Sequence, residues 1–153
     1  ARPLPAHAVA RGNLRADVVF HSGRWPDGQF AAELPRETPL SRELLLRGRE
    51  RYDIFCSPCH DDAGTGRGMV VRRGFKQPPS YHIDRLRELP LGYYVDVMTN
   101  GFGAMSSYAS QIPPADRWAI AAYVRALQAS QYSPVAELSA ADRAALSALP
   151  ANP

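Results

Sequence analysis

The residues best suited to chemistry are gathered in the segment Cys56-Ser57-Pro58-Cys59-His60. The segment holds both cysteines of the 153-residue chain and one of its four histidines. Two thiols at this spacing share one turn of backbone, and an imidazole follows directly. The pattern is typical of the attachment site of a c-type haem. In such a site the thiols form thioethers with the two vinyl groups of one porphyrin, and the histidine Nε2 binds the iron.

Three other interpretations fit this segment less well. A thioredoxin-like redox pair requires a βαβ setting, whereas a helical pattern precedes Cys56 and no strand pattern lies nearby. A structural zinc site usually has four cysteine or histidine ligands, but the other three histidines are scattered along the chain. A disulfide between the two cysteines would give His60 no role. We therefore expect one covalent haem c.

A six-coordinate haem needs a second axial ligand. The candidates are the methionines and the other histidines of the chain: Met69, Met98, Met105, His7, His21 and His82. We expect Met105, because small residues flank it and its loop precedes the last long helix, so that it can reach the face opposite His60. Met98 fits the core of its own helix and Met69 fits packing near the haem edge. His82 is the second choice of ligand.

A thioether ligand stabilises Fe(II) relative to a second imidazole and so raises the reduction potential. A methionine in this position also leaves no easy opening for O₂ or peroxide. The expected ligand pair, His60 and Met105, therefore favours electron transfer over chemistry on a small molecule.

Further residues are expected around the haem. A ligating histidine usually donates its other ring N–H to an acceptor, and we expect the carbonyl of Pro79, or next Pro78, to accept from His60 Nδ1. Arg72 and Arg73 are candidates for pairing with the haem propionates, because guanidinium groups suit carboxylates.

The elements that must position these residues are helical, and the predicted fold class is all-α. A helix is expected from the N-cap Ser41 to about Phe55, with Gly48 in its apolar stripe, where we expect close approach by another backbone. Other helices are expected at 83–88, 90–100, 114–129 and 140–149. Residues 61–80 form a glycine-rich and turn-rich connection.

Domain boundaries follow from composition. Residues 1–40, broken by five prolines, are expected to form an extended arm that is either disordered or laid along another surface. Phe20, Trp25 and Phe30 favour an arm docked on partner subunits, and only residues 17–20 could form a short strand. Residues 41–129 form the haem domain, and 130–153 form a C-terminal tail with one short helix.

Charge and hydropathy narrow the function further. Eighteen basic residues against fifteen acidic ones give an excess too small to indicate nucleic acid binding. No apolar run is long enough to span a bilayer. Without a signal peptide at its start, the chain is expected to be a mature or trimmed product.

The chain resembles the class I cytochromes c. Gly48-x-x-x-Tyr52 matches their first helix, and Ile120 and Tyr123 match the apolar and aromatic positions of their last helix. The resemblance implies that these helices cross at near right angles with the glycine at the contact. It also implies a distal role for Met105. Pro79-x-Tyr81 resembles the Pro-x-Leu of that family, so Tyr81 is expected beside the cofactor.

Longer stretches are similar to the monohaem cytochrome c subunit of bacterial alternative complex III, a membrane quinol-oxidising complex. The matching stretches are residues 9–12, 47–55, 78–82, 100–105 and 112–120. The resemblance implies a polyhaem subunit as electron donor and a terminal oxidase or mobile carrier as acceptor. It also implies a periplasmic location. Lipid anchoring, common in that subunit, would need a cysteine outside this sequence.

The sequence therefore predicts a one-electron carrier that performs no catalysis at its haem. Two alternatives remain open at this point: a freely diffusing periplasmic cytochrome c shuttle, and a haem enzyme or gas sensor with an open distal site.

Overall fold

The computed structural model describes residues 8–9 and 16–148, and over these residues it contains helices and no β-strand. The elements in chain order are α1 (Val18–Ser22), α2 (Arg42–Phe55), α3 (Ser57–His60), η1 (Val71–Arg73), α4 (Asp84–Arg87), α5 (Leu91–Asn100), α6 (Pro114–Tyr132), η2 (Val135–Glu137) and α7 (Ala140–Ser147). The predicted all-α class is confirmed. The ligand candidate His7 and residues 10–12 of the arm lie outside the described residues.

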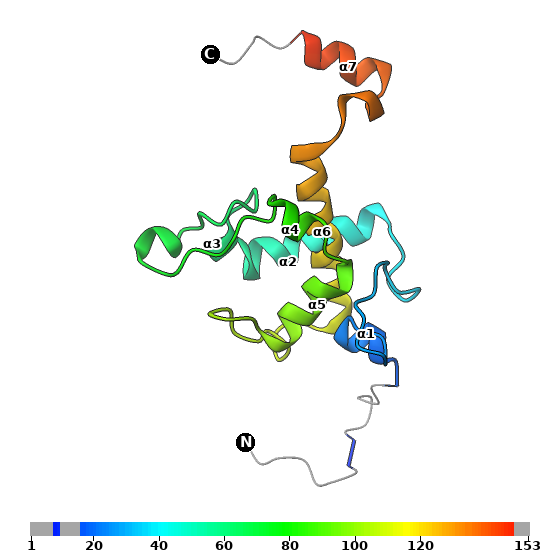
Figure 1. Ribbon diagram of the computed structural model, residues 1–153, viewed down its shortest axis with the longest axis vertical. Coiled ribbons are helices and arrows are strands. Elements are labelled where there is room, and N and C mark those ends of the chain that lie inside the picture. Colours follow the sequence, from blue (N-terminus) through cyan, green and yellow to red (C-terminus); the bar gives the residue numbers. More distant parts are fainter. Residues whose placement is uncertain (1–7, 10–15, 149–153) are drawn as a thin grey trace.

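Helices α2 and α6 cross at the centre of the molecule (Figure 1). The side chain of Ser41 caps α2 by accepting a hydrogen bond from the N–H of Leu44 at 3.1 Å. A Cβ atom at Gly48 would lie only 2.1 Å from the carbonyl oxygen of Ala119. The predicted close approach of a second backbone at Gly48 is therefore confirmed. Beside it, Arg47 binds Asp116 through Nε and Nη2, both at 2.8 Å.

The core lies between α2, α5 and α6. Its largest fully buried side chains are Tyr52 of α2, Val95 of α5, Ile112 just before α6, and Trp118, Ile120 and Val124 of α6. Burial is continuous along α6 from Asp116 to Ala122, so this helix is covered on more than one side. Met98 is 5% exposed and belongs to this core, as expected.

The segment 16–40 differs from the extended arm that composition predicts. Residues 18–20 form part of α1 and not a strand, because the Asp17 carboxylate caps the helix through the N–H of Phe20 at 2.8 Å. The β-branched pair Val18-Val19 favours a strand, but this local cap stabilises a helical turn instead. The isolated bridge between Arg24 and Phe30 then reverses the chain.

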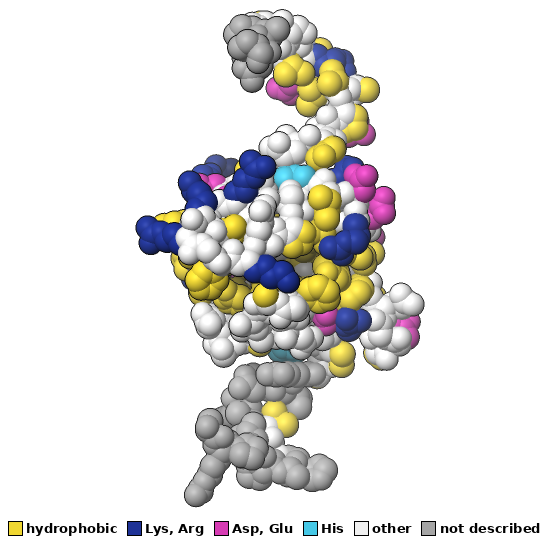
Figure 2. Space-filling model, turned by 60° about the vertical axis from the view of Figure 1, so that its left-hand side comes forward, with side chains coloured by type: hydrophobic (Ala, Val, Ile, Leu, Met, Phe, Trp, Pro, Cys, Tyr) yellow, Lys and Arg dark blue, Asp and Glu magenta, His cyan; other side chains and the backbone are white. Residues whose placement is uncertain are grey.

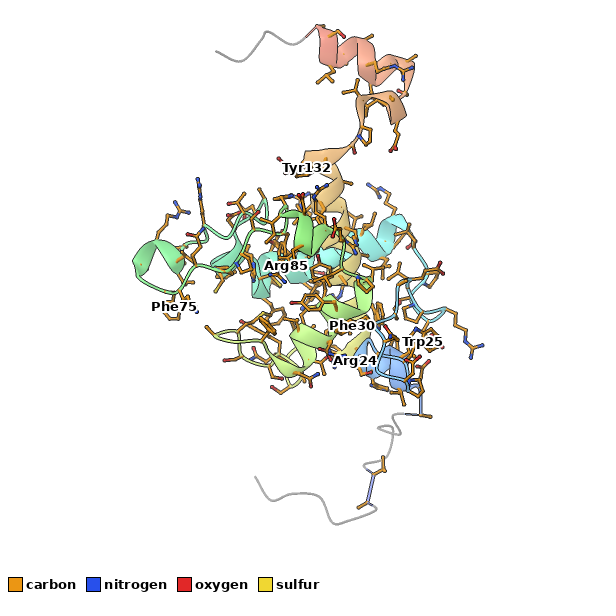
Figure 3. All side chains as sticks on the ribbon, in the orientation of Figure 1. Arg24, Trp25, Phe30, Phe75, Arg85 and Tyr132 are labelled. Atoms are coloured by element: carbon orange, nitrogen blue, oxygen red, sulfur yellow. The ribbon has the colours of Figure 1, made fainter. Side chains whose placement is uncertain are left out.

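This N-terminal segment, residues 16–40, packs against helices of the same chain. The Trp118 indole N–H donates to the carbonyl of Phe20 at 2.8 Å, and the N–H of Gly92 donates to Ala31 at 2.8 Å. Arg24 pairs with Asp96 of α5, and Figure 3 shows it beside this helix. Trp25, by contrast, stays 52% exposed. The segment therefore contributes to the folded domain.

The C-terminal part extends beyond the core. Helix α6 continues to Tyr132, three residues past its predicted end, and Arg87 stacks over the Tyr132 ring at 3.9 Å. Helix α7 begins after the predicted N-cap Ser139 and stands away from the rest of the molecule (Figure 1). All its residues are exposed. Within the described ranges, no helix combines the length and apolar character needed to cross a membrane.

Candidate haem site

The turn that carries the two thiols continues directly from α2. The N–H of Cys56 donates to the carbonyl of Tyr52 at 2.8 Å, and the N–H of His60 donates to Cys56 at 2.9 Å. Pro58 lies in the first turn of α3, where its missing N–H costs no hydrogen bond. The motif is thus hydrogen-bonded to the last turn of α2 through the buried Tyr52.

Both cysteines are free thiols, Cys56 buried and Cys59 half-buried. Burial, with a smaller contribution from Cys59, raises the pKa of Cys56 to about 12. A redox-active thiol needs the opposite shift, because the thiolate is the reactive form. The described residues also contain no strand, so the βαβ setting of a thioredoxin-like pair is missing.

Asp61 ends the turn immediately after the histidine. Its φ of 56° is the one positive value at a non-glycine residue in the described part of the chain. Its carboxylate accepts hydrogen bonds from the N–H groups of Ala63, Thr65 and Arg67 at 2.9, 3.1 and 2.8 Å, and from the Thr65 hydroxyl. The buried Tyr52 hydroxyl donates to the Asp61 carbonyl at 2.7 Å. Asp61 thus reverses the chain.

Sequence reasoning missed the role of Asp61. The available signal was an aspartate ahead of a Gly- and Thr-rich stretch, since aspartate side chains commonly bind backbone N–H groups in turns. Burial raises the pKa of this carboxyl, but the hydrogen bonds that it accepts outweigh burial and lower the pKa overall.

The glycine-rich connection folds back onto α3. The N–H groups of Gly66, Gly68 and Val70 donate to the carbonyls of His60, Cys59 and Pro58, each at 3.0 Å. A Cβ atom at Gly68 would lie 2.3 Å from the Pro58 oxygen, so only glycine permits this approach. The connection therefore satisfies the last carbonyls of the short helix and holds it in place.

His60 is presented in the form that binds iron. Burial lowers its pKa to about 4, although the neighbouring Asp61 charge partly opposes this, so its imidazole is neutral at neutral pH. The ring stacks on Tyr81 with centroids 4.6 Å apart and planes at 11°. Tyr81 therefore lies at the site, as the resemblance implied, and burial raises its pKa well above the usual value.

The expected hydrogen bond from His60 Nδ1 to Pro79 or Pro78 is not made. Nδ1 is buried and has no hydrogen-bond partner among the described residues. Pro79 is exposed, and the Pro78 carbonyl instead lies against Gly66, 2.3 Å from where a Cβ atom would be. The prolines thus shape the connection, and the face of Tyr81 contacts the imidazole.

Met105 lies in a tight loop between α5 and α6. It exchanges two backbone hydrogen bonds with Phe102, at 2.9 and 3.0 Å. Gly101 has a φ of 80°, and a Cβ atom added there would lie 2.6 Å from the Met105 carbonyl oxygen. The Met105 side chain is half-buried and packs against the core. It therefore remains the best-placed candidate for a second ligand.

The other ligand candidates are less well placed. Met69 is 51% exposed, and its expected packing near the haem edge stays a prediction. His82 Nε2 lies 2.6 Å from the Ala63 carbonyl, so this nitrogen is already engaged. His21 lies on α1, packed against Phe20.

The connection 61–80 and the Met105 loop lie on the same side of the molecule (Figure 1). Figure 2 turns this side forward and shows hydrophobic side chains across it, with Lys and Arg gathered at its upper left. Arg72 and Arg73 are exposed, and no ion pair involves either of them within the described residues. Their pairing with haem propionates stays a prediction.

These residues fit a covalently attached haem. The two free thiols could form the thioethers, and the neutral His60 imidazole could donate Nε2 to iron while Nδ1 keeps the proton. Three backbone hydrogen bonds hold the turn that carries all three residues.

Comparison with known proteins agrees with this site. Residues 43–124, more than half of the chain, match the family model described as cytochrome C oxidase, cbb3-type, subunit III. The matched segment includes the cysteine motif, Tyr81 and Met105. No curated protein matches the chain.

Proposed function

The chain belongs to the cytochrome c family described as cbb3-type subunit III, and on that premise we propose that His60 and Met105 are the axial ligands of its haem. Its cofactor is covalently bound haem c, and its function is electron transfer through that haem. Bound haem supplies an iron that alternates between Fe(III) and Fe(II). The chain binds it, orients the ligand and limits access of water.

The observation that carries this proposal is the placement of His60. Its half-buried imidazole follows two free thiols on one turn of backbone, and burial lowers its pKa to about 4. Met105 offers a thioether from a tight loop that is closed by its two backbone hydrogen bonds with Phe102. A thioether ligand raises the potential, which suits an electron carrier.

The ligand assignment can be tested with Met105→Ala. The variant should keep its covalent haem, lose the sulfur-to-iron charge-transfer band of the oxidised protein and have a lower reduction potential. When reduced, it should bind carbon monoxide, which wild type should resist. Met69→Ala, at an exposed methionine, is the matched control and should change none of these. A wild-type band and potential in Met105→Ala would refute the assignment.

We further propose that the chain works as the monohaem subunit of a quinol-oxidising membrane complex of the alternative complex III type, on the periplasmic side. Electrons would come from a polyhaem subunit and leave to a terminal oxidase or mobile carrier. Support comes from the stretches 47–55, 78–82, 100–105 and 112–120. Haem c is attached outside the cytoplasm in this family, which supports the location.

A freely diffusing shuttle is the second candidate, and one observation favours it. The N-terminal segment packs on its own domain through Trp118 and Gly92, so docking on a partner is not needed to account for it. Affinity purification of the tagged chain from solubilised native membranes separates the two. A complex in which added quinol reduces this haem supports the subunit. Recovery of the haem protein from the soluble fraction alone supports the shuttle.

A further inference from the structure

The plane of His60 is held by an aromatic face in this protein. The Tyr81 ring lies 4.6 Å from the imidazole, nearly parallel to it, and Nδ1 has no hydrogen-bond partner among the described residues. An axial imidazole turns about its bond to iron unless a group outside the metal site restrains it. In most sites that restraint is a hydrogen bond to the other ring nitrogen. Here a stacked ring is the restraint that the structure offers.

Tyr81 is itself held firmly on both sides of its backbone. Its N–H donates to the Gly64 carbonyl at 2.9 Å, and its carbonyl accepts from Gln128 Nε2 at 2.8 Å. Gly64, with a φ of 77°, gives the ring room, since a Cβ atom there would lie 2.8 Å from Tyr81 Cδ2. The ring has little freedom to move away from the imidazole.

Other aromatic rings enclose Tyr81. Tyr52 lies 6.4 Å away at a tilt of 58°, and Tyr94 lies 6.1 Å away, edge to face. Gln128 also donates to the Tyr94 hydroxyl at 2.9 Å, so one α6 side chain ties two of these tyrosines together. A flat, fixed surface therefore faces His60.

We propose that Tyr81 is a positioning residue that fixes the plane of the His60 imidazole by stacking on it, in place of a hydrogen bond at Nδ1. The inference rests on the proposed function in that it takes His60 as the iron ligand. Leucine, which the related cytochromes carry at this position, would fill the volume without a flat face. Phenylalanine would keep the face, so the proposal assigns the effect to the ring and not to the hydroxyl.

The first test uses the haem-loaded wild-type chain in its reduced, diamagnetic form. Proton NMR should show nuclear Overhauser contacts between the ring protons of Tyr81 and His60. Strong upfield shifts of the His60 ring protons by the porphyrin report ligation independently of those contacts. Upfield-shifted His60 protons without contacts to Tyr81 would overturn the stacking proposal, and unshifted protons would overturn the ligand assignment itself.

The second test compares haem-methyl shifts in the oxidised protein, because their pattern depends on the orientation of the imidazole plane. Tyr81→Phe should keep the wild-type pattern, whereas Tyr81→Leu should change it. Phe30→Leu is the control, since Phe30 of the N-terminal segment packs against Tyr93 and Arg24 and its replacement should leave the pattern unchanged. A wild-type pattern in Tyr81→Leu would refute the proposal, as would a changed pattern in Tyr81→Phe. If Tyr81→Leu does not fold, the wild-type contacts still decide.

Discussion

The contact between α2 and α6 predicts a large effect from one methyl group at Gly48. The added Cβ atom would meet the Ala119 carbonyl oxygen at 2.1 Å and the carbonyl carbon at 2.7 Å. Both are backbone atoms of a buried helix and cannot rotate away. Overpacking of this kind costs about 3 kcal/mol at the upper end of its usual range, while alanine gains about 1 kcal/mol in helix propensity.

We therefore expect Gly48→Ala to lower the free energy of unfolding by about 2 kcal/mol. For a chain of this size the melting temperature should fall by about 4–8 °C. Thermal unfolding of the haem-loaded protein, followed by circular dichroism, measures the change. Arg42→Ala, at an exposed position of the same helix, is the control and should melt close to wild type.

A further substitution identifies the cause. Ala119→Gly in the Gly48→Ala background should not restore stability, because the clash involves the Ala119 backbone and not its methyl group. A Gly48→Ala protein that melts at or above the wild-type temperature would show that the two helices do not approach in this way.

Three further outcomes are expected. The pKa of Asp61 is lowered in the folded protein, so its charged form stabilises the fold at pH values above the ordinary pKa of 3.8. This stabilisation is lost as the pH falls below that value. Between pH 5 and 3 the melting temperature of Asp61→Asn should therefore fall less than that of wild type. Tyr52→Phe removes the 2.7 Å bond to the Asp61 carbonyl and should cost about 1 kcal/mol of unfolding free energy in chemical denaturation. Asp116→Asn weakens the two-point pair with Arg47, and its melting temperature should lie below wild type by a margin that shrinks in high salt; equal margins in low and high salt would contradict this.

The sequence predicted those elements that local signals determine. Ser41 as an N-cap, the apolar stripe of α2 and the long final helix all have local causes. Gly48 indicated a partner backbone because glycine inside a helix lowers its stability. Such a residue is expected where a second chain segment occupies the space of a side chain. The two thiols and His60 could be identified because attachment to one porphyrin requires their spacing along the chain.

The remaining errors have both local and long-range causes. Residues 18–20 have strand-forming side chains, yet a local cap at Asp17 and docking on α6 make them helical. Pro79 is the expected acceptor for His60 Nδ1, but the fold of the connection exposes that proline. No pattern in the sequence shows which way a carbonyl faces, so such errors are expected wherever a loop folds back on a helix.

Because the N-terminal segment docks on the helices, the part of the chain that folds together is longer than the segment that matches the family model. The family match begins at residue 43, yet the Trp118 indole, the Arg117 guanidinium and the Gly92 amide all find acceptors between residues 20 and 31. A polypeptide trimmed to the match would remove these acceptors from donors on both α5 and α6. The minimal haem-carrying unit of this protein therefore begins well upstream of the region that the family model covers.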